Sequence, residues 1–587
     1  MPLKQSDPFF YETFPDAGKV AYFSMEIAIE PAMPTYAGGL GVLAGDTLRS
    51  AADLGIPLVA FTLLHRKGYF RQHLDASGMQ TESVQPWNPA DFCTEETARV
   101  TVTLEGRIVT LRAWRYDLEG CTGHVVPIYM LDTDLEENAG WDRGLTDHLY
   151  GGDTNYRLQQ EIVLGMGGVR MANALGLHVN VFHMNEGHAA LLTLALLESQ
   201  LGGGPLGAAT EADIEQVRRK CVFTTHTPVP AGHDRFSTEQ AIRILGSDRT
   251  ARLEKLGSFR DGLLNMTLLA LNFSRYANGV AMQHGKVSRA MFPEFRIDTI
   301  TNGVHAPTWI SEPVGKMLNE EIPAWRRDNL YLRNAIDLPE EKILAAHARA
   351  KEVLLAEVGS RTGLVLNPKV LTLGCARRAA TYKRVGLLFT DPVRLAEIAA
   401  KAGGLQIVYA GKAHPQDEPG KMLIQHVVED AAKFSNDVLR IVYLENYDWG
   451  LGALLTAGVD VWVNTPRRPY EASGTSGMKA AMNGVPSLSI LDGWWIEGCI
   501  EGVTGWAIED GVNDQEEAQS LYRKLESAVV PLYLAAPEQW ARLMRTTLAF
   551  NGSYFNTNRM VKQYTRNSYY PVKLIEAAKV EIEAYAN

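Results

Sequence analysis

VLTLGC at residues 370–375, LQIVYAG at 405–411, LRIVYL at 439–444 and VDVWVN at 459–464 are four apolar runs that decide the fold class. Each has the length of a buried strand. The segments between them, including YKRVGLLFTDPVRLAEIAAKA and GKMLIQHVVEDAAKF, have the spacing of helices. Strands that alternate with helices predict an α/β fold with a doubly wound parallel sheet, in which ligands bind beyond the carboxyl ends of the strands.

The first half of the chain carries similar runs, at Val20–Ile29, Ile56–Leu64, VNVFHMNEGH (179–188) and CVFTTHTP (221–228). An alternating pattern around Glu105-Gly106 predicts a hairpin, and Leu158–Leu175 predicts a helix. The proline- and charge-containing segment Ser311–Glu340 is the candidate linker between the halves. We therefore expect two Rossmann-like lobes with a cleft between them.

Composition narrows the class of protein. Hydrophobic residues make up 46% of the 587 residues, as in ordinary globular proteins. Lys+Arg at 57 against Asp+Glu at 68 gives 57 − 68 = −11, which argues against nucleic acid as a partner. The N-terminal residues lack the apolar stretch of a signal peptide, and the run at Ile56–Leu64 is too short to cross a bilayer. Five scattered cysteines without a CxxC pair predict neither disulfides nor zinc, so we expect a cytoplasmic protein with no membrane contact.

The segment Tyr470–Trp495, YEASGTSGMKAAMNGVPSLSILDGWW, is the most informative for chemistry. The glycine-rich turn SGTSG runs into a predicted helix, whose free N–H groups suit an anion. Lys479 lies just inside that helix, where it could pair with phosphate or form a Schiff base with an aldehyde cofactor such as pyridoxal phosphate. The alternative is a surface lysine on an amphipathic helix. Glu471 could hold sugar hydroxyls or cap a turn.

Two further segments indicate an anion site. GCARRAATYKR (374–384) places four cations after a buried strand, an arrangement that is costly unless an anion compensates their charge, although a solvated helix start is the alternative. PTYAGGLGVLAGD (34–46) is a glycine-rich loop before a helix and is a weaker signal. HMNEGH (183–188) and TTHTPVPAGHDRF (224–236) hold four histidines without metal-ligand spacing, so we expect hydrogen bonds to a polar ligand and no metal.

These residues resemble the glycogen/starch (α-glucan) phosphorylase family, and in particular a short bacterial- or archaeal-type member. The decisive match is EASGTSGMKAAMNG, which is similar to that family's pyridoxal-phosphate lysine segment. AGGLGVLAGD, LYGGDTNYRLQQE, NEGHAAL, THTPVP, TNGVHAPTW, RRAATYKR, GKAHP and YLENY support it in the same order along the chain. The similarity extends from about Val20 to Gly498.

The resemblance implies a GT-B architecture, with two Rossmann-like lobes facing a deep cleft. Residues 1–320 would form the N-terminal lobe, residues 321–545 the C-terminal lobe, and residues 546–587 a helical segment that crosses back. It also implies a glycosyltransferase: inorganic phosphate cleaves the terminal α-1,4-linked glucose of glycogen, starch or maltodextrin to glucose 1-phosphate, with retained configuration. The cofactor would be pyridoxal 5'-phosphate, covalently held as an aldimine on Lys479, and its phosphate group would handle the proton. A homodimer is what the family suggests.

The family's motifs also assign site residues. Four residues would be catalytic. His226 would lie near the reacting carbon of the sugar, Arg378 and Lys383 would bind the substrate phosphate, and Lys479 would be the fourth. The cofactor would contact Arg377, the backbone of Thr475 and Ser476, and Tyr447. The remaining substrate-binding residues would be Gly38, Gly39, Leu40, Asn185, Glu186, Glu471, Ala472, Ser473 and Gly474.

This chain departs from the family's usual pattern at Arg377, where lysine is common, at Ser476-Gly477, at Asp448, where arginine is common, and at NEGH. It is shorter than the animal and plant enzymes, and we do not expect control by phosphorylation. The nearest rival function is a GT-B glucan synthase that uses a nucleotide sugar. Such enzymes carry a lysine before the first Gly-Gly, where this chain has Tyr36-Ala37, and a second glutamate, where this chain has Lys479. A non-catalytic glucan-binding descendant is disfavoured by the intact cation cluster.

Overall fold

The four apolar runs of the second half form four adjacent strands of a six-stranded parallel sheet. The computed structural model describes residues 18–571. The sheet consists, in spatial order, of β18 (Leu439–Leu444), β17 (Leu405–Ala410), β16 (Leu371–Ala376), β19 (Val461–Asn464), β20 (Ser487–Ile490) and β21 (Gly505–Ile508). The prediction of a parallel sheet is confirmed. Chain order reverses between β16 and β19, the position where such sheets bind ligands.

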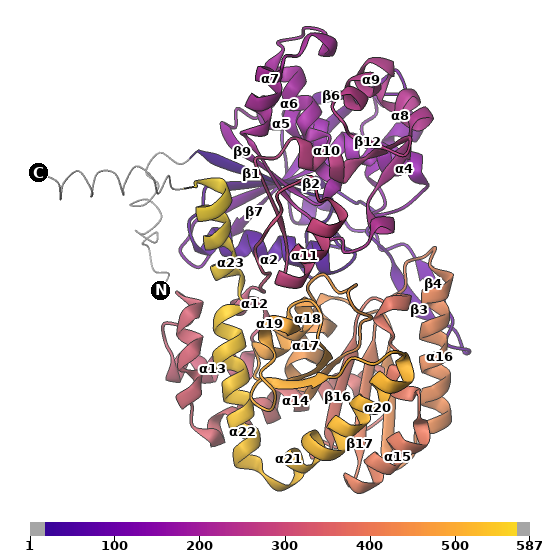
Figure 1. Ribbon diagram of the computed structural model, residues 1–587, viewed down its shortest axis with the longest axis vertical. Helices are drawn as coiled ribbons and strands as arrows, with labels where there is room; N and C mark the ends of the chain where they lie inside the picture. The colour runs from indigo at the N-terminus through magenta and orange to yellow at the C-terminus, as the bar shows by residue number, and fades with distance from the viewer. Residues whose placement is uncertain (1–17, 572–587) are drawn as a thin grey trace, which may run out of the picture.

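Helices precede, connect and follow these strands and cover the sheet (Figure 1). They are α14 (Glu340–Thr362), α15 (Pro392–Lys401), α16 (Glu418–Phe434), α17 (Trp449–Gly458), α18 (Thr475–Ala481) and α20 (Asp514–Lys524). The single helix expected over residues 382–402 is wrong in its first half, which forms the short 3-10 turns η8 (Thr381–Lys383) and η9 (Leu387–Phe389). Asp391 caps α15 by accepting a hydrogen bond from the Arg394 N–H, and Pro392 occupies the first turn. That pair starts a new helix.

The first half forms a larger, mixed sheet. Its parallel part runs β15 (Asp298–Thr299), β14 (Tyr276–Gly279), β10 (Cys221–Thr224), β9 (Val179–Asn185), β1 (Lys19–Ser24), β2 (Leu58–Leu63) and β8 (Val125–Asp132). Antiparallel β7 (Arg107–Glu119) extends it and pairs with β5 (Thr94–Glu95) and β6 (Val100–Leu104). The hairpin turn at Glu105-Gly106 is confirmed, and both residues have positive φ, at 50° and 77°. This suits a tight hairpin connection.

The predicted helix at Leu158–Leu175 is present as α4 (Thr154–Ile162), a π turn (Val163–Gly167) and α5 (Gly168–Ala174). A smaller hairpin of β3 (Arg71–Leu74) and β4 (Gln80–Ser83) extends from this half beside α16. No helix within residues 18–571 is long and apolar enough to span a membrane.

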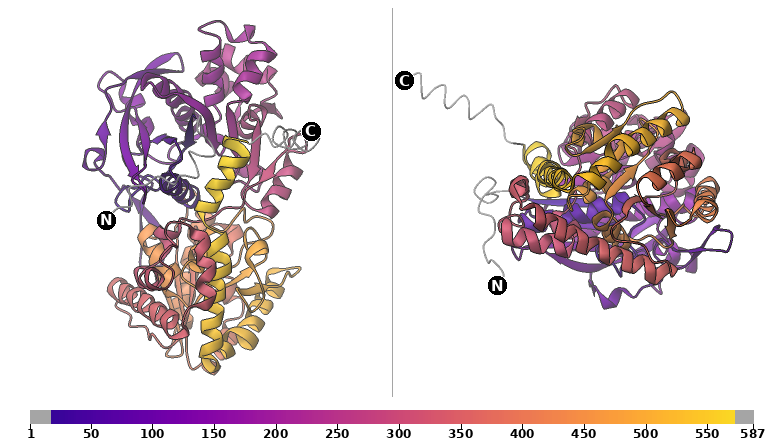
Figure 2. Two further views of the ribbon diagram at one scale, coloured as in Figure 1. Left: turned by 90° about the vertical axis from the view of Figure 1, so that its left-hand side faces the viewer. Right: turned by 90° about the horizontal axis from the view of Figure 1, so that it is seen from below.

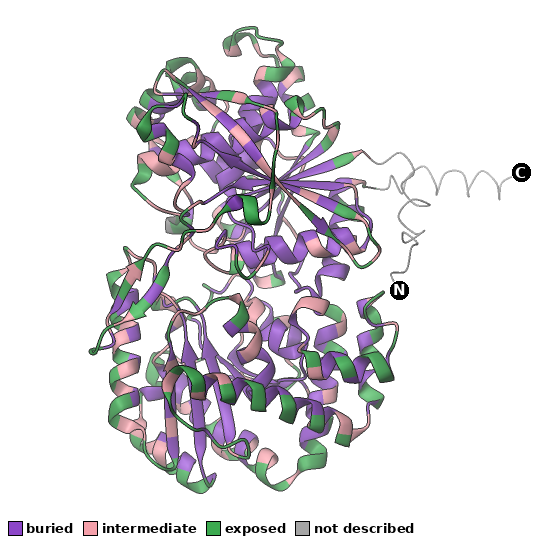
Figure 3. Cartoon of the chain, turned by 180° about the vertical axis from the view of Figure 1, so that it is seen from behind, coloured by how far each residue is buried: buried purple, intermediate pink, exposed green. Residues whose placement is uncertain are grey.

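The segment Ser311–Glu340 is not a loose linker, which corrects that expectation. It forms α13 (Glu312–Glu321) and the 3-10 segment η7 (Asn329–Asp337), and Trp325 and Leu332 are fully buried within it. Two of its three prolines lie at helix starts, because Pro313 is in the first turn of α13 and Pro339 occupies the N-cap position of α14. Buried residues fill the centre of both halves in Figure 3.

The end of the described chain lies against the first half. Helix α22 (Pro537–Thr546) packs in the second half, and α23 (Thr557–Tyr564) lies beside α2 (Gly39–Asp53). The Ser50 and Thr557 hydroxyls are 2.6 Å apart. Figure 2 shows the C-terminal helices running from one half to the other. The expected crossing segment 546–587 lies partly outside the described residues, since 572–587 are not described.

Candidate active site

Three loops meet at the carboxyl edge of the six-stranded sheet. Arg377 and Arg378 follow β16, Glu471 lies on the segment after β19, and Asp492 follows β20. Because β16 and β19 are neighbours at the point where chain order reverses, their loops border the expected ligand position. Arg377, Arg378 and Glu471, three of the predicted site residues, therefore lie at one edge of the sheet.

Arg377 is a buried cation whose partners are carbonyl groups. It donates hydrogen bonds to the Val463 carbonyl at 2.9 Å and to the Lys383 carbonyl at 3.4 Å. Burial lowers its pKa from the ordinary arginine value. Among residues 18–571, no carboxylate forms an ion pair with Arg377 or Arg378. Two adjacent cations without ion-pair partners suit a bound anion.

Arg378 links this edge to the other half. Its side chain is exposed, but the protein around the guanidinium group removes part of its hydration. This desolvation by itself would lower the pKa of Arg378. Tyr382, Tyr69 and Glu26 outweigh that effect and raise its pKa. Tyr69 and Glu26 both belong to the first half, so the two halves share the electrostatic environment of this arginine.

Lys383 and Arg384 are neighbours in sequence with different partners. Lys383 forms an ion pair with Glu471, the carboxylate that the resemblance places in the glucose pocket. Arg384 is buried and paired with Glu517 and, at 2.9 Å, with Asp514. It also donates to two loop carbonyls. Arg384 therefore fastens the loop to α20, while Lys383 pairs with Glu471, another of the predicted site residues.

The segment Glu471–Gly474 is held by its backbone. The Glu471 N–H donates to Asp492 at 2.9 Å, and burial raises the pKa of that aspartate to about 6. The Ser473 carbonyl accepts from Trp494 N–H at 2.8 Å, while the Ser473 hydroxyl is buried and makes no hydrogen bond within the described chain. Gly474 precedes α18 with φ of 86°, a conformation that favours glycine. Ala472 lies between Glu471 and Ser473, whose backbone groups make these hydrogen bonds.

Lys479 is buried in α18, seven residues long, whose first residues are Thr475 and Ser476. Its ammonium nitrogen lies 3.7 Å from the centroid of the Trp309 ring. Burial lowers its pKa to about 8, and the negative charge of Asp46 offsets only part of that effect. No ion pair of Lys479 is present in the described chain. A buried, partly neutral amine of this kind is a functional candidate and excludes the surface-lysine alternative.

Tyr447 and Asp448 lie close to the glycine-rich loop of the first half. The backbone N–H of Trp449 donates to the Tyr36 hydroxyl at 2.8 Å. Asp448 caps α17 by accepting from the Leu451 N–H, also at 2.8 Å. An aspartate where the family commonly has arginine thus has a local structural role.

Gly38, Gly39 and Leu40 form the start of α2, which no side chain caps. A Cβ atom on Gly38 or Gly39 would meet no atom within 4 Å, so the helix start faces open space. The Glu26 carboxylate accepts from the Gly38 N–H at 3.1 Å and from the Tyr150 hydroxyl at 2.8 Å. Sequence reasoning missed Glu26. Its signal was a carboxylate within the apolar run Val20–Ile29.

His226, Asn185 and Glu186 form one group at the carboxyl edge of β9 and β10. The Nε2 atom of the His226 ring lies 2.7 Å from the Asn185 amide oxygen. The Glu186 carboxylate accepts a hydrogen bond from the backbone N–H of His226, also at 2.7 Å. Burial lowers the pKa of His226 to about 4, and the negative charge of Glu186 offsets only part of that effect. Glu186 has φ of 73° and also accepts from the Thr227 hydroxyl at 3.0 Å. Its carboxylate therefore holds the His226 loop.

The other histidines do not join this group as metal ligands. His183 lies between the hydroxyls of Tyr569 and Thr224, at 2.7 and 2.8 Å. Across residues 18–571, no set of three or more histidine, cysteine, aspartate or glutamate side chains could hold a metal ion.

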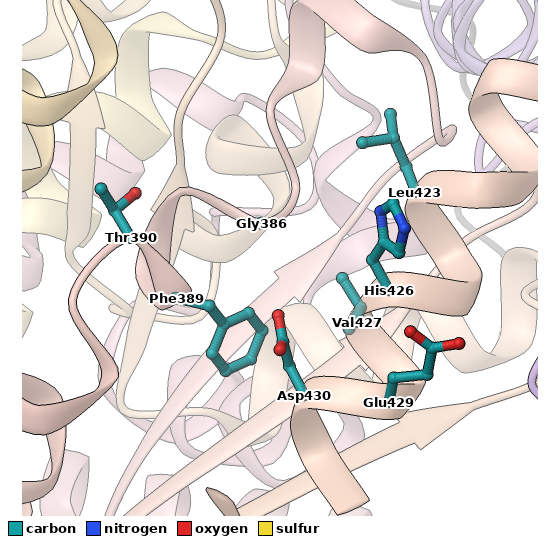
Figure 4. Close-up of a pocket in the computed structure, with 8 residues that line it drawn as sticks. All are labelled: Gly386, Phe389, Thr390, Leu423, His426, Val427, Glu429 and Asp430. Carbon is teal, nitrogen blue, oxygen red and sulfur yellow. The ribbon is translucent and has the colours of Figure 1, made fainter. Parts of the chain in front are cut away.

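A separate pocket of about 300 Å³ lies between η9 and α16 (Figure 4). Phe389 and Val427 supply apolar surface, and polar groups of α16 surround them. None of the predicted site residues lines it. Its lining residues are Gly386, Phe389, Thr390, Leu423, His426, Val427, Glu429 and Asp430.

Parallel α/β sheets, with unpaired arginines and a buried lysine at one carboxyl edge, define the class of proteins that bind an anionic ligand beyond their strands. Residues 230–505 match the sequence profile of a family described as carbohydrate phosphorylase. Maltodextrin phosphorylase of Thermococcus litoralis is 38% identical, over 96% of this chain and 72% of its own. Glycogen phosphorylases of Mycobacterium bovis and Aquifex aeolicus are 37% and 35% identical, over 96% and 94% of this chain and 73% and 86% of theirs.

The chain belongs to the carbohydrate phosphorylase family. The resemblance seen in the sequence motifs is thereby confirmed.

Proposed function

We propose that the protein is an α-1,4-glucan phosphorylase, a glycosyltransferase that releases glucose 1-phosphate from glycogen, starch or maltodextrin. Inorganic phosphate is the second substrate. The observation that carries the proposal is the buried Lys479 on the same sheet edge as Arg377 and Arg378, neither of which has a carboxylate ion-pair partner in the described chain. Relatives named maltodextrin phosphorylase and glycogen phosphorylase support it.

The residues around Lys479 fit pyridoxal 5'-phosphate. The lysine is buried, and its lowered pKa of about 8 keeps part of the amine neutral and able to attack an aldehyde. Arg377, held by carbonyls alone, supplies a positive charge for a phosphate group. Arg377, Tyr447 and the backbone of Thr475 and Ser476 would hold the cofactor, with Lys479 as its covalent anchor. When bound, the cofactor supplies a phosphate group that handles the proton.

The protein's own groups bind and orient the two substrates. Arg378 and Lys383 would bind inorganic phosphate as charge-assisted donors, facing the start of α2 at Gly38–Leu40. Glu471, Ala472, Ser473 and Gly474 would hold the glucose unit. His226, with a pKa of about 4, is neutral at pH 7 and so adds no positive charge where the sugar becomes oxocarbenium-like. Glu186 and Asn185 would orient His226.

The proposal extends to the whole chain. Residues 1–320 and 321–545 would be two Rossmann-like lobes of a GT-B architecture facing a cleft, and 546–587 would join them. The parallel sheet of the second half, the largely parallel sheet of the first half and the contact of α23 with α2 support this division. A homodimer and a cytoplasmic location stay predictions.

The test measures cofactor binding and catalytic activity on the same protein samples. Purified wild type should show a cofactor absorbance band and release glucose 1-phosphate from maltodextrin only when phosphate is present. Lys479→Ala should lose both, whereas Lys433→Ala, which changes an exposed lysine in the last turn of α16, should keep both. A colourless wild type that transfers glucose only from a nucleotide sugar would establish the glucan synthase alternative instead.

A further inference from the structure

The hairpin of β3 and β4 joins the two halves of the molecule. It belongs to the first half by sequence and lies along α16 of the second (Figures 1 and 3). Glu82 pairs with Lys421 of α16 at 3.1 Å, and a Cβ atom on Gly78 would come within 2.7 Å of Val428. The hairpin is therefore fitted closely to the second half.

Two buried glutamines of this hairpin bind the loop after β17. Gln72 is 0% exposed and Gln80 is 2% exposed. The Gln72 amide donates to the Gly411 carbonyl and to the Gln80 side chain, both at 2.9 Å. Gln80 donates to the Ala413 carbonyl and accepts from the Ala413 N–H, both at 2.9 Å. Breaking such buried pairs leaves polar groups unsatisfied, which is costly.

The same loop is bonded on its other side to the arginine segment. The Arg377 N–H donates to the Ala410 carbonyl at 3.1 Å, and the Ala379 N–H donates to the Lys412 carbonyl at 2.9 Å. A Cβ atom on Gly411 would lie 2.0 Å from the Arg377 carbonyl, so the two backbones are in direct contact. A displacement of the loop must therefore displace the segment that carries Arg377 and Arg378.

We infer that Gln72 and Gln80 are positioning residues for phosphate binding, which act through the Gly411–Ala413 loop on Arg377 and Arg378. This inference rests on the proposed function, because it takes those arginines as phosphate-binding groups. The hairpin comes from the other half, so the geometry of the phosphate site depends on how the halves are held together. In this inference the two glutamines act through the loop and do not contact phosphate themselves.

The test uses the full-length protein with its cofactor, titrated calorimetrically with inorganic phosphate. Gln80→Glu cannot donate to the Ala413 carbonyl and places a negative charge against it. We expect phosphate to bind about tenfold more weakly, as for a small displacement of binding groups, while the KM for maltodextrin stays within twofold. Gln72→Met, which adds no charge, should weaken phosphate binding in the same direction and serves if the glutamate variant does not fold.

Gln406→Glu is the matched control. Gln406 is also 2% exposed and lies on β17, the strand that leads into Gly411, but at its opposite end. It bonds to Asn367 and Thr372, away from the loop. This variant should lower the unfolding temperature and leave phosphate affinity unchanged.

Three results would overturn the inference: phosphate affinity within twofold of wild type in both hairpin variants, an equal loss in Gln406→Glu, or no phosphate binding by wild type. Failure of the proposed function has a different signature. It would be a wild type that binds phosphate and responds to Gln80→Glu but releases no glucose 1-phosphate, and the inference about positioning would then stand.

Discussion

The ammonium nitrogen of Lys479 lies 3.7 Å from the centroid of the Trp309 ring. The indole N–H of Trp309 donates in turn to Asp46 at 2.7 Å, and the other oxygen of Asp46 is buried without a hydrogen bond in the described chain. The ring face stabilises a cation while burial opposes it. With a pKa of about 8, Lys479 is therefore divided between its charged and neutral forms near pH 8.

We expect the reactivity of Lys479 to titrate near pH 8 in cofactor-free protein. Burial lowers its pKa to about 8, so the nucleophilic amine appears as pH rises through that value, whereas an ordinary lysine needs about 10.4. Asp46→Asn removes the charge that raises this pKa and should shift the midpoint lower. Amine modification followed by peptide mass spectrometry at several pH values measures both midpoints.

Circular dichroism on the same samples checks that each protein is folded. A midpoint above pH 9.5, or one that Asp46→Asn leaves in place, would show that the buried environment of Lys479 does not control its charge.

Glu471→Gln should strengthen phosphate binding and weaken glucan use. Glu471 neutralises part of the charge of Lys383, and both side chains are largely buried. Freed of its partner, Lys383 can attract phosphate about fivefold more strongly, which corresponds to about 1 kcal/mol. Calorimetric titration with phosphate and the KM for maltodextrin measure the two effects.

Glu501→Gln removes a glutamate from an exposed pair with Lys524 and should change neither quantity. Weaker phosphate binding in Glu471→Gln would mean that the ion pair orders Lys383 for phosphate rather than competing with it.

Arg384→Met and Lys383→Met should separate stability from binding. Arg384 is buried between Glu517 and Asp514, so its loss leaves uncompensated charge and should lower the free energy of unfolding by about 3–5 kcal/mol. Lys383→Met should mainly weaken phosphate binding. Urea unfolding and phosphate titration of both variants measure the contrast. Equal effects of the two substitutions on phosphate binding would place Arg384 in the site after all.

The strands of the second half could be predicted because their buried positions are continuous. β16, β17 and β19 are buried along their whole length, and such strands appear in sequence as uninterrupted apolar runs. The break at Asp391-Pro392 was missed because a long apolar periodicity masked its capping residues. Prolines in Ser311–Glu340 suggested a linker, but Pro313 and Pro339 lie at helix starts, and Trp325 of the same segment is fully buried.

The candidate site was predictable only as far as single segments reveal it. The charge of the cluster after β16 predicts an anion site, and this stays a prediction. The different partners of Lys383 and Arg384 could not be predicted, because Glu471 and Glu517 lie far away in sequence. Gln72 and Gln80 carried no signal, since an isolated glutamine is ordinary until its partners are known.

The stability of the protein should fall as pH decreases from 6.5 towards 4, and His183 should account for part of that slope. Burial lowers the pKa of His183 to about 3. Between that value and the ordinary 6.5 the unfolded chain takes up a proton that the folded protein refuses, so acid favours unfolding by about 1.4 kcal/mol per pH unit for each such histidine. His183→Gln should flatten the dependence of the unfolding free energy on pH in this window. Above pH 7, where neither state charges the ring, the two proteins should give parallel curves. Identical slopes between pH 6.5 and 5 would mean that the folded protein accommodates a charged His183 between Tyr569 and Thr224.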